Sequence, residues 1–460
     1  MEVIDGISRH DSIIIGQELA ARLERLPVTK THVLIRLVVG CATFFDGYTS
    51  LAIAYAVPVL FRLWHLSPKE IGVVISAGFA GQLLGALIFG FLAERIGRLR
   101  ALTICVAIYA LMSIACIFTW DLNALVVFRF IQGIGVGGEV PVAATYINEF
   151  SSAKRRGRFF LLYELLFSIG LMASGLIGYL LVPLYGWRVM FIIGAIPALL
   201  IVPLSLLLPE SPRWLISKNK LDQARFIIEK IETRLRLKNI ILPAPAPIAI
   251  GQAKALGNWR ELFSPFYRRR TFMLWALWFC AFIVNNGLVT WLPTLYRVVF
   301  HLPLNTSLLF GLMTTTTAIV ASFLCAIYMD KVGRRRWYIF AFFFASLLFL
   351  VLGLHESHSF IGILLFASCG YASMQTITIS LYLYTGELYP TRIRALGTGI
   401  GSAWLRLAST IAPMLVGIIV SHYSISLVFI MFAGFSAIGG AVTALFAVSS
   451  EGKILESLSP

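Results

Sequence analysis

The sequence predicts an all-α membrane protein in which twelve transmembrane helices form two pseudo-symmetric six-helix halves. Three observations predict this fold class: the composition, the recurrence of long apolar stretches, and a pair of motifs that occurs twice. Of the 460 residues, 58% are hydrophobic and 13% are charged. Soluble globular proteins carry about a quarter charged residues. The composition therefore excludes an ordinary cytosolic enzyme, and its apolar content excludes a disordered chain.

The apolar stretches follow one another almost from end to end of the chain. Most have about the 20 residues that a helix needs to cross a bilayer. The predicted spans, in chain order, are 33–61, 70–93, 101–119, 122–147, 159–182, 187–208, 271–296, 306–329, 337–354, 359–387, 395–420 and 424–447.

The positive charges are distributed unevenly between the two sides that these spans define. With both termini on one side, the segments on that side hold 32 of the 38 Lys and Arg residues, and the opposite loops hold four. Such an excess marks the cytoplasmic side. We therefore expect both termini in the cytoplasm, and we interpret the net charge of +16 as topology with attraction to anionic lipid, not as nucleic-acid binding.

The residues that commonly hold metals or cofactors show no ligand pattern. All six cysteines fall inside or at the edges of apolar spans without a Cys-x-x-Cys spacing, so we interpret them as small core residues. No Gly-x-x-x-x-Gly-Lys-Ser/Thr loop is present, which makes ATP an unsuitable energy source. We expect no metal and no cofactor.

Two motifs recur after nearly the same number of residues. Segment 90–100 (GFLAERIGRLR) follows the second span, and segment 326–336 (AIYMDKVGRRR) follows the eighth, 236 residues later. Glu149 after span 4 and Glu387 after span 10 are 238 residues apart, each followed by basic residues. A nearly constant offset predicts two six-helix halves in parallel repeat.

The repeats divide the chain into five predicted segments. Residues 1–32 form a cytoplasmic N-terminal segment, 33–208 the first half, 271–447 the second half, and 448–460 a cytoplasmic tail. Between the halves, 209–270 carries most of the surplus positive charge and a Pro-Ala-Pro-Ala-Pro run. We expect a cytoplasmic linker with short amphipathic helices followed by an extended segment.

The repeated loop Gly-x-x-x-Asp/Glu-Arg-x-Gly-Arg is similar to the signature of the major facilitator superfamily. Three further segments agree with it at matching spacing: 129–133 (RFIQG), 209–214 (PESPRW) and 386–392 (GELYPTR). Together they cover nearly the whole chain. They resemble the branch that holds sugar porters, organic-ion transporters and metabolite–proton symporters such as niacin transporters. The resemblance implies a secondary transporter, not an enzyme, that works as a monomer by alternating access.

Acidic and basic residues gather at the cytoplasmic ends of the predicted helices. Ion pairs there would hold the two halves together in the outward-facing state and break when the protein opens inward. The alternative is a static topology anchor. The gate residues that we predict are Glu94, Arg95, Arg98, Glu149, Arg156, Asp330, Arg334, Glu387 and Arg394.

Ionisable residues inside apolar spans are costly and are therefore functional candidates. Asp46 lies in 44–48 (FFDGY), which resembles the Asp-Gly-Tyr-Asp of aromatic-acid–proton symporters, with Thr49 in place of the second Asp. Glu164 in span 5 falls, by resemblance, where sugar porters place a sugar-contacting Gln. Burial raises a carboxyl pKa, so we predict Asp46 and Glu164 as proton-coupling sites. The alternative for Asp46 is helix packing.

Arg406 in span 11 is similar in position to an Arg that helps organic-anion transporters hold their substrate. Its planar fork suits a carboxylate. The alternative is a permanent salt bridge to Asp46 or Glu164. Arg129 is also intramembrane, and its family role is structural or linked to coupling. The glycines at 133, 135, 137 and 138 predict close helix packing and not a dinucleotide loop.

Aromatic and polar residues beside these charges complete the predicted site. Asn286 and Tyr382 fall where organic-ion transporters contact their substrates, and for any single aromatic the alternative is packing or an interfacial belt. The predicted substrate-binding residues are Arg406, Glu164, Asn285, Asn286, Tyr382, Tyr48, Ser402 and Trp404. Span 7 lacks the Gln-Gln-x-Ser-Gly of sugar porters, which argues against sugars.

The function that we expect is uptake of a small organic anion together with a proton, with an aromatic monocarboxylate such as nicotinate as the substrate. A sugar, polyol or organic-cation transporter of the same fold is the alternative. A receptor on the same scaffold, binding without flux, is a third class.

Overall fold

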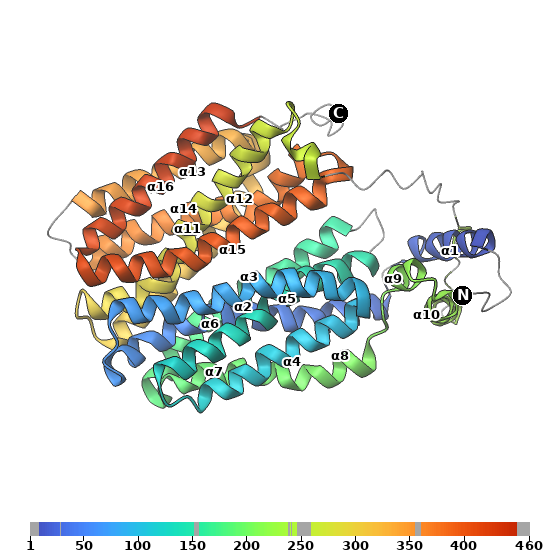
Figure 1. Cartoon of the computed structure of the whole chain (residues 1–460), viewed down its shortest axis with the longest axis horizontal. Helices are drawn as coiled ribbons and strands as arrows, with labels where there is room; N and C mark the ends of the chain where they lie inside the picture. Colours follow the sequence, from blue (N-terminus) through green and yellow to red (C-terminus); the bar gives the residue numbers. More distant parts are fainter. Residues whose placement is uncertain are drawn as a thin grey trace.

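The computed structural model describes residues 9–27, 29–150, 156–237, 240, 242–245, 259–354 and 360–448. The regular structure within these residues is helical throughout. Figure 1 shows two bundles of long helices side by side, with α1 (Arg9–Glu24), α9 (Pro212–Ser217) and α10 (Leu221–Arg236) grouped at one end. We call that end the terminal face, because α1 lies there and α16 ends there, and the opposite end the far face.

The N-terminal bundle is the lower one in Figure 1. It contains α2 (Lys30–Leu63), α3 (Pro68–Ile96), α4 (Arg98–Ile117), α5 (Leu122–Phe150), α6 (Arg156–Tyr185), α7 (Arg188–Gly194), the 3₁₀ helix η1 (Ile196–Leu200) and α8 (Ile201–Leu207). The upper, C-terminal bundle contains η2 (Trp259–Phe263), α11 (Arg268–Val298), α12 (Leu304–Val332), α13 (Arg334–Leu354), α14 (Phe360–Leu388), α15 (Thr391–His422) and α16 (Ile425–Phe446).

Within the described residues, eleven helices are long and apolar enough to cross a membrane, and a shorter apolar helix covers Arg188–Leu200. The predicted sixth span, 187–208, is thus the one that departs from a continuous helix. Pro197 and Pro203 lie inside it, and a proline supplies no N–H for the helical ladder. The backbone changes to a 3₁₀ turn at Ile196–Leu200 and resumes as α8.

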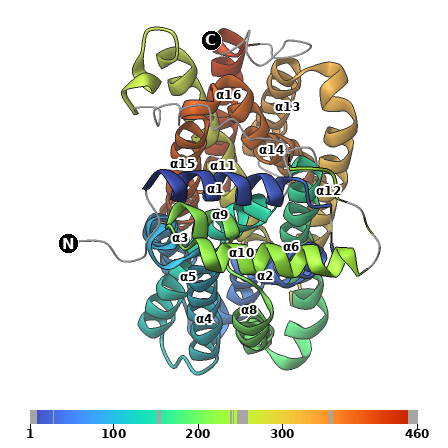
Figure 2. The same cartoon turned by 90° about the vertical axis from the view of Figure 1, so that its right-hand side faces the viewer.

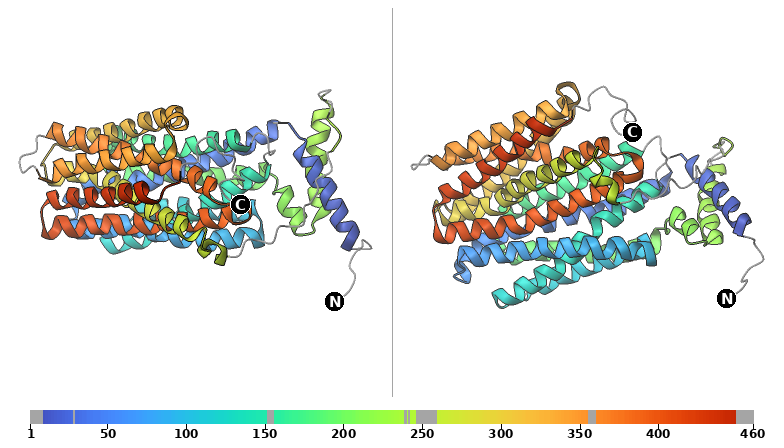
Figure 3. Two further views of the ribbon diagram at one scale, coloured as in Figure 1. Left: turned by 90° about the horizontal axis from the view of Figure 1, so that it is seen from above. Right: turned by 45° about the horizontal axis from the view of Figure 1, so that its top comes forward.

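On the far face, the backbones of the two bundles are in direct contact. A Cβ atom added to Gly72 of α3 would lie 2.8 Å from the Pro413 carbonyl oxygen of α15, and one added to Gly417 would lie 2.6 Å from the Pro68 carbonyl oxygen. Toward the terminal face the ribbons diverge (Figure 1, and Figure 3 from two other sides). A Cβ atom at Gly90 of α3 or Gly399 of α15 would meet none of the described atoms within 4 Å.

A three-helix unit of α1, α9 and α10 lies across the terminal face, as Figure 2 shows from that side. Its apolar core includes Leu19, Leu23, Trp214 and Ile228. The indole nitrogen of Trp214 donates to the Glu94 carbonyl oxygen (3.0 Å) at the end of α3, which fastens the unit to the N-terminal bundle.

A buried carboxylate also holds this unit together. Glu232 of α10 is 2% exposed and forms ion pairs of 2.7 Å with Arg22, which lies in α1, and with Arg25, which directly follows α1. Burial alone raises the pKa of the Glu232 carboxyl, but the hydrogen bonds from Arg22 and Arg25 outweigh burial and hold this pKa below its usual value.

Candidate functional site

Arg406 of α15 reaches from the C-terminal bundle into the N-terminal bundle. It is 7% exposed. Its Nη1 donates to the Gln82 side-chain oxygen of α3 (3.3 Å), and its Nη2 donates to the Gly137 carbonyl oxygen of α5 (3.5 Å). Its Nε has no hydrogen-bond partner among the described residues. The cation is therefore held by neutral acceptors and keeps donor capacity.

The local sequence explains why the Gly137 carbonyl can accept from Arg406. In a helix this oxygen would bond the N–H four residues later. That residue is Pro141, which has no N–H, so the carbonyl is left for an outside donor. Position 137 also has to be glycine, because a Cβ atom there would lie 2.1 Å from the backbone carbonyl oxygen of Gln82.

A chain of polar groups continues from Arg406 to Asp46 of α2. The Gln82 amide nitrogen donates to the Ser50 hydroxyl oxygen at 3.5 Å, and the Ser50 hydroxyl donates to the Asp46 carboxylate at 3.5 Å. Asp46 is 1% exposed and lies within electrostatic range of Arg406. The hydrogen bonds described for Arg406 run to Gln82 and Gly137, and its connection to Asp46 passes through Gln82 and Ser50.

Glu139 of α5 is a buried carboxylate that the sequence analysis missed. It is 0% exposed and accepts a hydrogen bond from Thr43 of α2 at 2.8 Å. Glu139 and Asp46 both act electrostatically on Tyr109 of α4, so the two carboxylates share one region of the N-terminal bundle. The sequence does contain a signal for Glu139, because an acidic residue inside the predicted span 122–147 is costly there and is therefore a functional candidate.

The predicted amides of α11 are tied to the neighbouring helices of the C-terminal bundle. Asn286 donates to the Ser409 hydroxyl at 2.6 Å, and Ser409 lies one turn from Arg406 on α15. Asn285 is 5% exposed and donates to the Gln375 side chain of α14 at 2.8 Å.

Tyr382 of α14 is the aromatic candidate that lies near Arg406. It is 44% exposed and within electrostatic range of the guanidinium. Its ring meets Trp278 of α11 edge to face, with centroids 4.7 Å apart. An aromatic ligand can pack against a partly exposed phenol ring of this kind.

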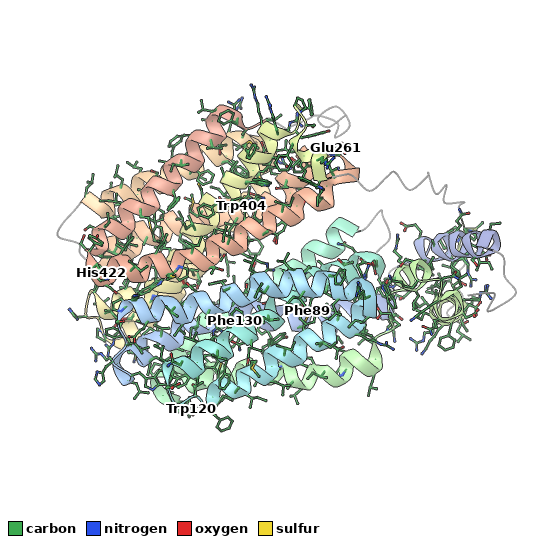
Figure 4. The ribbon with its side chains drawn as sticks, viewed as in Figure 1. Phe89, Trp120, Phe130, Glu261, Trp404 and His422 are labelled. Carbon is green, nitrogen blue, oxygen red and sulfur yellow. The ribbon has the colours of Figure 1, made fainter. Side chains whose placement is uncertain are left out.

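Tyr48 and Trp404 instead pack within their own bundles. Tyr48 is 0% exposed and its hydroxyl donates to the Met190 carbonyl oxygen of α7 at 3.0 Å. Trp404 lies in the C-terminal bundle (Figure 4), 5.7 Å from the Trp275 ring centroid. Tyr48 is two residues from Asp46, and Trp404 is two residues from Arg406. On a helix, two residues correspond to about 200° around the axis, so each aromatic ring lies on the side of its helix opposite to the charge.

The remaining intramembrane candidates divide between described and undescribed side chains. Ser402 is half-buried one turn from Arg406, on the same side of α15. Arg129 is 4% exposed, and its Nη1 donates to Gln132 on its own helix at 2.5 Å. Glu164 belongs to α6, but its side chain lies outside the described residues.

The predicted gate residues pair within each bundle. In the N-terminal bundle Arg98 contacts Glu94 (2.7 Å) and Glu149 (3.0 Å), and in the C-terminal bundle Arg334 contacts Glu387 (3.0 Å).

The other gate residues show the same pattern where their side chains are described. Arg95 stacks over the Phe91 ring at 4.2 Å, and the Arg394 Nε donates to the Tyr389 carbonyl oxygen at 3.2 Å. The side chains of Arg156 and Asp330 lie outside the described residues.

The chain resembles characterised transport proteins over nearly its whole length. Residues 34–460 match the family model described as "Sugar (and other) transporter". The chain is 32% identical to the niacin transporter NiaP of Acinetobacter baylyi over 96% of this chain and 99% of that protein. It is 27% identical to the benzoate transport protein of the same organism, covering 86% of this chain and 84% of the relative.

A solved structure supports the same fold. The D-xylose-proton symporter superimposes with a TM-score of 0.74 at 19% identity, covering 92% of this chain and 100% of that one. The predicted fold class and the predicted family resemblance are therefore confirmed.

Proposed function

Because the chain belongs to the sugar (and other) transporter family of the major facilitator superfamily, and is thus a multi-pass secondary transporter and not an enzyme, we propose that it takes up an aromatic monocarboxylate by proton symport. Nicotinate is the substrate that we favour. The observation that carries the proposal is Arg406, a buried cation between the two bundles whose hydrogen-bond acceptors are neutral.

A carboxylate is the ligand that suits this cation best. Arginine stays charged when buried, and its fork can donate two parallel hydrogen bonds to a carboxylate. Gln82 and Gly137 offer dipoles where the substrate would offer a full charge. The partly exposed Tyr382 ring next to Trp278 adds a surface against which an aromatic ring can pack.

The relatives support the same ligand chemistry. One is named for niacin and the other for benzoate, and both compounds carry a carboxyl group on an aromatic ring. Asn286, Ser402 and Ser409 would add hydrogen bonds to this ligand, since all three lie within about one turn of the arginine level.

Asp46 is the protonation site that we favour, with Glu164 as a second one. Asp46 is 1% exposed and lies in the field of Arg406, so its charge and that of a bound carboxylate act on the same cation. When Asp46 is protonated and a carboxylate pairs with Arg406, little unpaired charge remains in the occluded site. Only the doubly loaded or the empty carrier would then reorient readily.

We place the terminal face in the cytoplasm, and the protein in the inner membrane as a monomer. The excess of Lys and Arg on the side of the termini supports this orientation. Close contacts lie at Gly72 and Gly417 on the far face, whereas no described atom lies within 4 Å of the Cβ positions of Gly90 and Gly399, so the conformation is then inward-facing. Alternating access requires the predicted gate residues to approach across the bundles in the outward-facing state.

Uptake of labelled nicotinate into proteoliposomes tests the proposal. With an acidic exterior, we expect accumulation that benzoate inhibits and that a protonophore abolishes, and we expect Arg406→Ala to abolish it. Thr314→Val is the control, because Thr314 is also a buried polar residue but is bonded to Ser368 within the C-terminal bundle. Uptake that ignores a collapsed proton gradient would exclude the symport. Thermal stabilisation by sugars or amines instead of aromatic acids would exclude the anion.

A further inference from the structure

We infer that Gln82 is a positioning residue that transmits the protonation state of Asp46 to Arg406. The inference rests on the proposed function and explains how proton and carboxylate binding are linked there. Its basis is the polar chain across the bundles: Arg406 to Gln82 at 3.3 Å, Gln82 to Ser50 at 3.5 Å, and Ser50 to Asp46 at 3.5 Å.

The direction of every hydrogen bond in this chain follows from its two ends. A guanidinium has donors only, so Gln82 must present its side-chain amide oxygen to Arg406. The amide nitrogen of Gln82 then faces Ser50 and can only donate. The Ser50 hydroxyl proton is thereby directed to Asp46, which accepts it as a carboxylate. The observed arrangement therefore fits ionised Asp46, with Arg406 occupied by Gln82.

Protonation of Asp46 reverses this chain. A protonated carboxyl group donates to the Ser50 oxygen, and the hydroxyl then donates toward Gln82. To accept that bond, the amide turns its oxygen to Ser50 and its nitrogen to Arg406. Donor then faces donor, and Nη1 of Arg406 is released. The substrate carboxylate takes that place, so protonation of Asp46 and substrate binding favour each other by the same factor.

Other titratable groups lie near Asp46, and their contributions to a pH dependence have to be distinguished from that of Asp46. Cys105 and Tyr109 of α4 lie in the same field, and both are neutral at ordinary pH. Tyr382 of α14 is close to Arg406. Glu139 of α5 is the other carboxylate in this region, bonded to Thr43. From α6, the backbone of Phe167 closes on Gly47 beside Asp46, while the Glu164 side chain lies outside the described residues.

The test is the pH dependence of nicotinate affinity, measured by calorimetry on the purified full-length protein between pH 5.5 and 8. For the wild type we expect the Kd to rise by up to about tenfold per pH unit, which corresponds to one linked proton. Gln82→Leu removes the competitor of the substrate, so we expect tight binding with a change below about twofold per unit. Asp46→Asn should also be flat, whereas Glu139→Gln should keep the slope.

Ser50→Ala provides an independent variant, because it cuts the same chain by removing one oxygen and leaves the amide in place. We expect the flat profile again, and no further change in the Gln82→Leu/Ser50→Ala double variant, since both residues serve one path. Thr314→Val is the matched control: Thr314 is buried and bonded to Ser368 in the C-terminal bundle, and its loss should leave the slope unchanged.

Two results would overturn the inference, and they can be told apart. If Gln82→Leu or Ser50→Ala binds nicotinate with the wild-type slope, the relay is wrong while the proposed function stands. If Gln82→Leu does not fold, the slope of Ser50→Ala decides alone. If the wild type binds neither nicotinate nor benzoate at any pH, the proposed function fails, and the relay fails with it.

Discussion

At the scale of single residues, the candidate site depends on a cation whose hydrogen-bond partners among the described residues are neutral. Arg406 is bound by an amide oxygen and by a backbone oxygen that Pro141 has left without a helical donor. Neither acceptor offsets a full charge in a medium of low dielectric constant. A substrate carboxylate therefore gains more from this site than it would from an arginine already paired with a carboxylate.

Arg406→Lys separates charge from geometry. Lysine keeps the positive charge but replaces the planar fork with a single ammonium group. We expect the affinity for nicotinate to fall about tenfold to hundredfold, with little change in the thermal unfolding midpoint. Calorimetry and a thermal-shift assay measure both quantities. Arg213→Lys, the control in the three-helix unit, should leave the affinity within about twofold. Equal affinities of wild type and Arg406→Lys would show that only charge is recognised.

The sequence marks some residues of this candidate site and not others, for definite physical reasons. Asp46 and Arg406 are charges in apolar spans, so their cost makes them visible without a structure. Gln82 carries no charge, and its partner is 324 residues away, so nothing in the chain marks it. Tyr48 and Trp404 were predicted as ligand contacts because they neighbour the charges. Which way a helix is rotated depends on packing that one sequence does not reveal.

At the scale of elements, the three-helix unit is the part of the fold that the sequence described least. The amphipathic pattern at 209–270 predicted short helices, and α9 and α10 lie there. The helix α1 was not predicted, because its apolar face is completed only when Leu19 and Leu23 meet Trp214 and Ile228. The break in the sixth span had a signal in Pro197 and Pro203.

The ion pairs of Glu232 make the three-helix unit sensitive to acid. The pKa of Glu232 is lower in the folded protein than its ordinary value of about 4.3, so its stabilisation is fully present above that value. It is lost as the pH falls through the lower, folded pKa. We expect hydrogen exchange in α1 and α10 to accelerate as the pH falls below about 4, before exchange in the transmembrane helices changes.

Glu232→Gln should produce the same loosening at neutral pH. Removing the charge leaves Arg22 and Arg25 without their buried partner, which costs about 3 kcal/mol of local stability. Limited proteolysis of α1 measures the effect. Glu229→Gln is the matched control, because Glu229 is 52% exposed and 3.8 Å from Arg22, and an exposed pair contributes at most about 1 kcal/mol. Equal proteolysis rates for the two variants would contradict the assignment.

At the scale of the whole molecule, the sequence predicted the architecture well because the bilayer imposes it. A helix is the form in which an isolated apolar segment satisfies its backbone in lipid, so the spans could be located from composition alone. The repeated motifs divided them into two halves. The conformation could not be predicted, since it depends on contacts between bundles, such as that of Gly72 with Pro413, which the same sequence makes and breaks during transport.

Gly72→Trp should shift the protein toward the conformation that is closed at the terminal face. The indole cannot fit where a Cβ atom would already lie 2.8 Å from the Pro413 carbonyl oxygen, so the far face cannot close. Gly399→Cys, in a variant without the six native cysteines, reports the other side, because its Cβ position has no described neighbour within 4 Å. We expect an impermeant maleimide to label Cys at position 399 about tenfold more slowly when Gly72 is replaced, which corresponds to a population shift of about 1.4 kcal/mol.

Gly90→Trp on the same helix is the control, because its side chain has no described atom within 4 Å of its Cβ position and should not block closure of the far face. If Gly72→Trp leaves the labelling rate unchanged, the contact of α3 with α15 does not control which side of the protein is open.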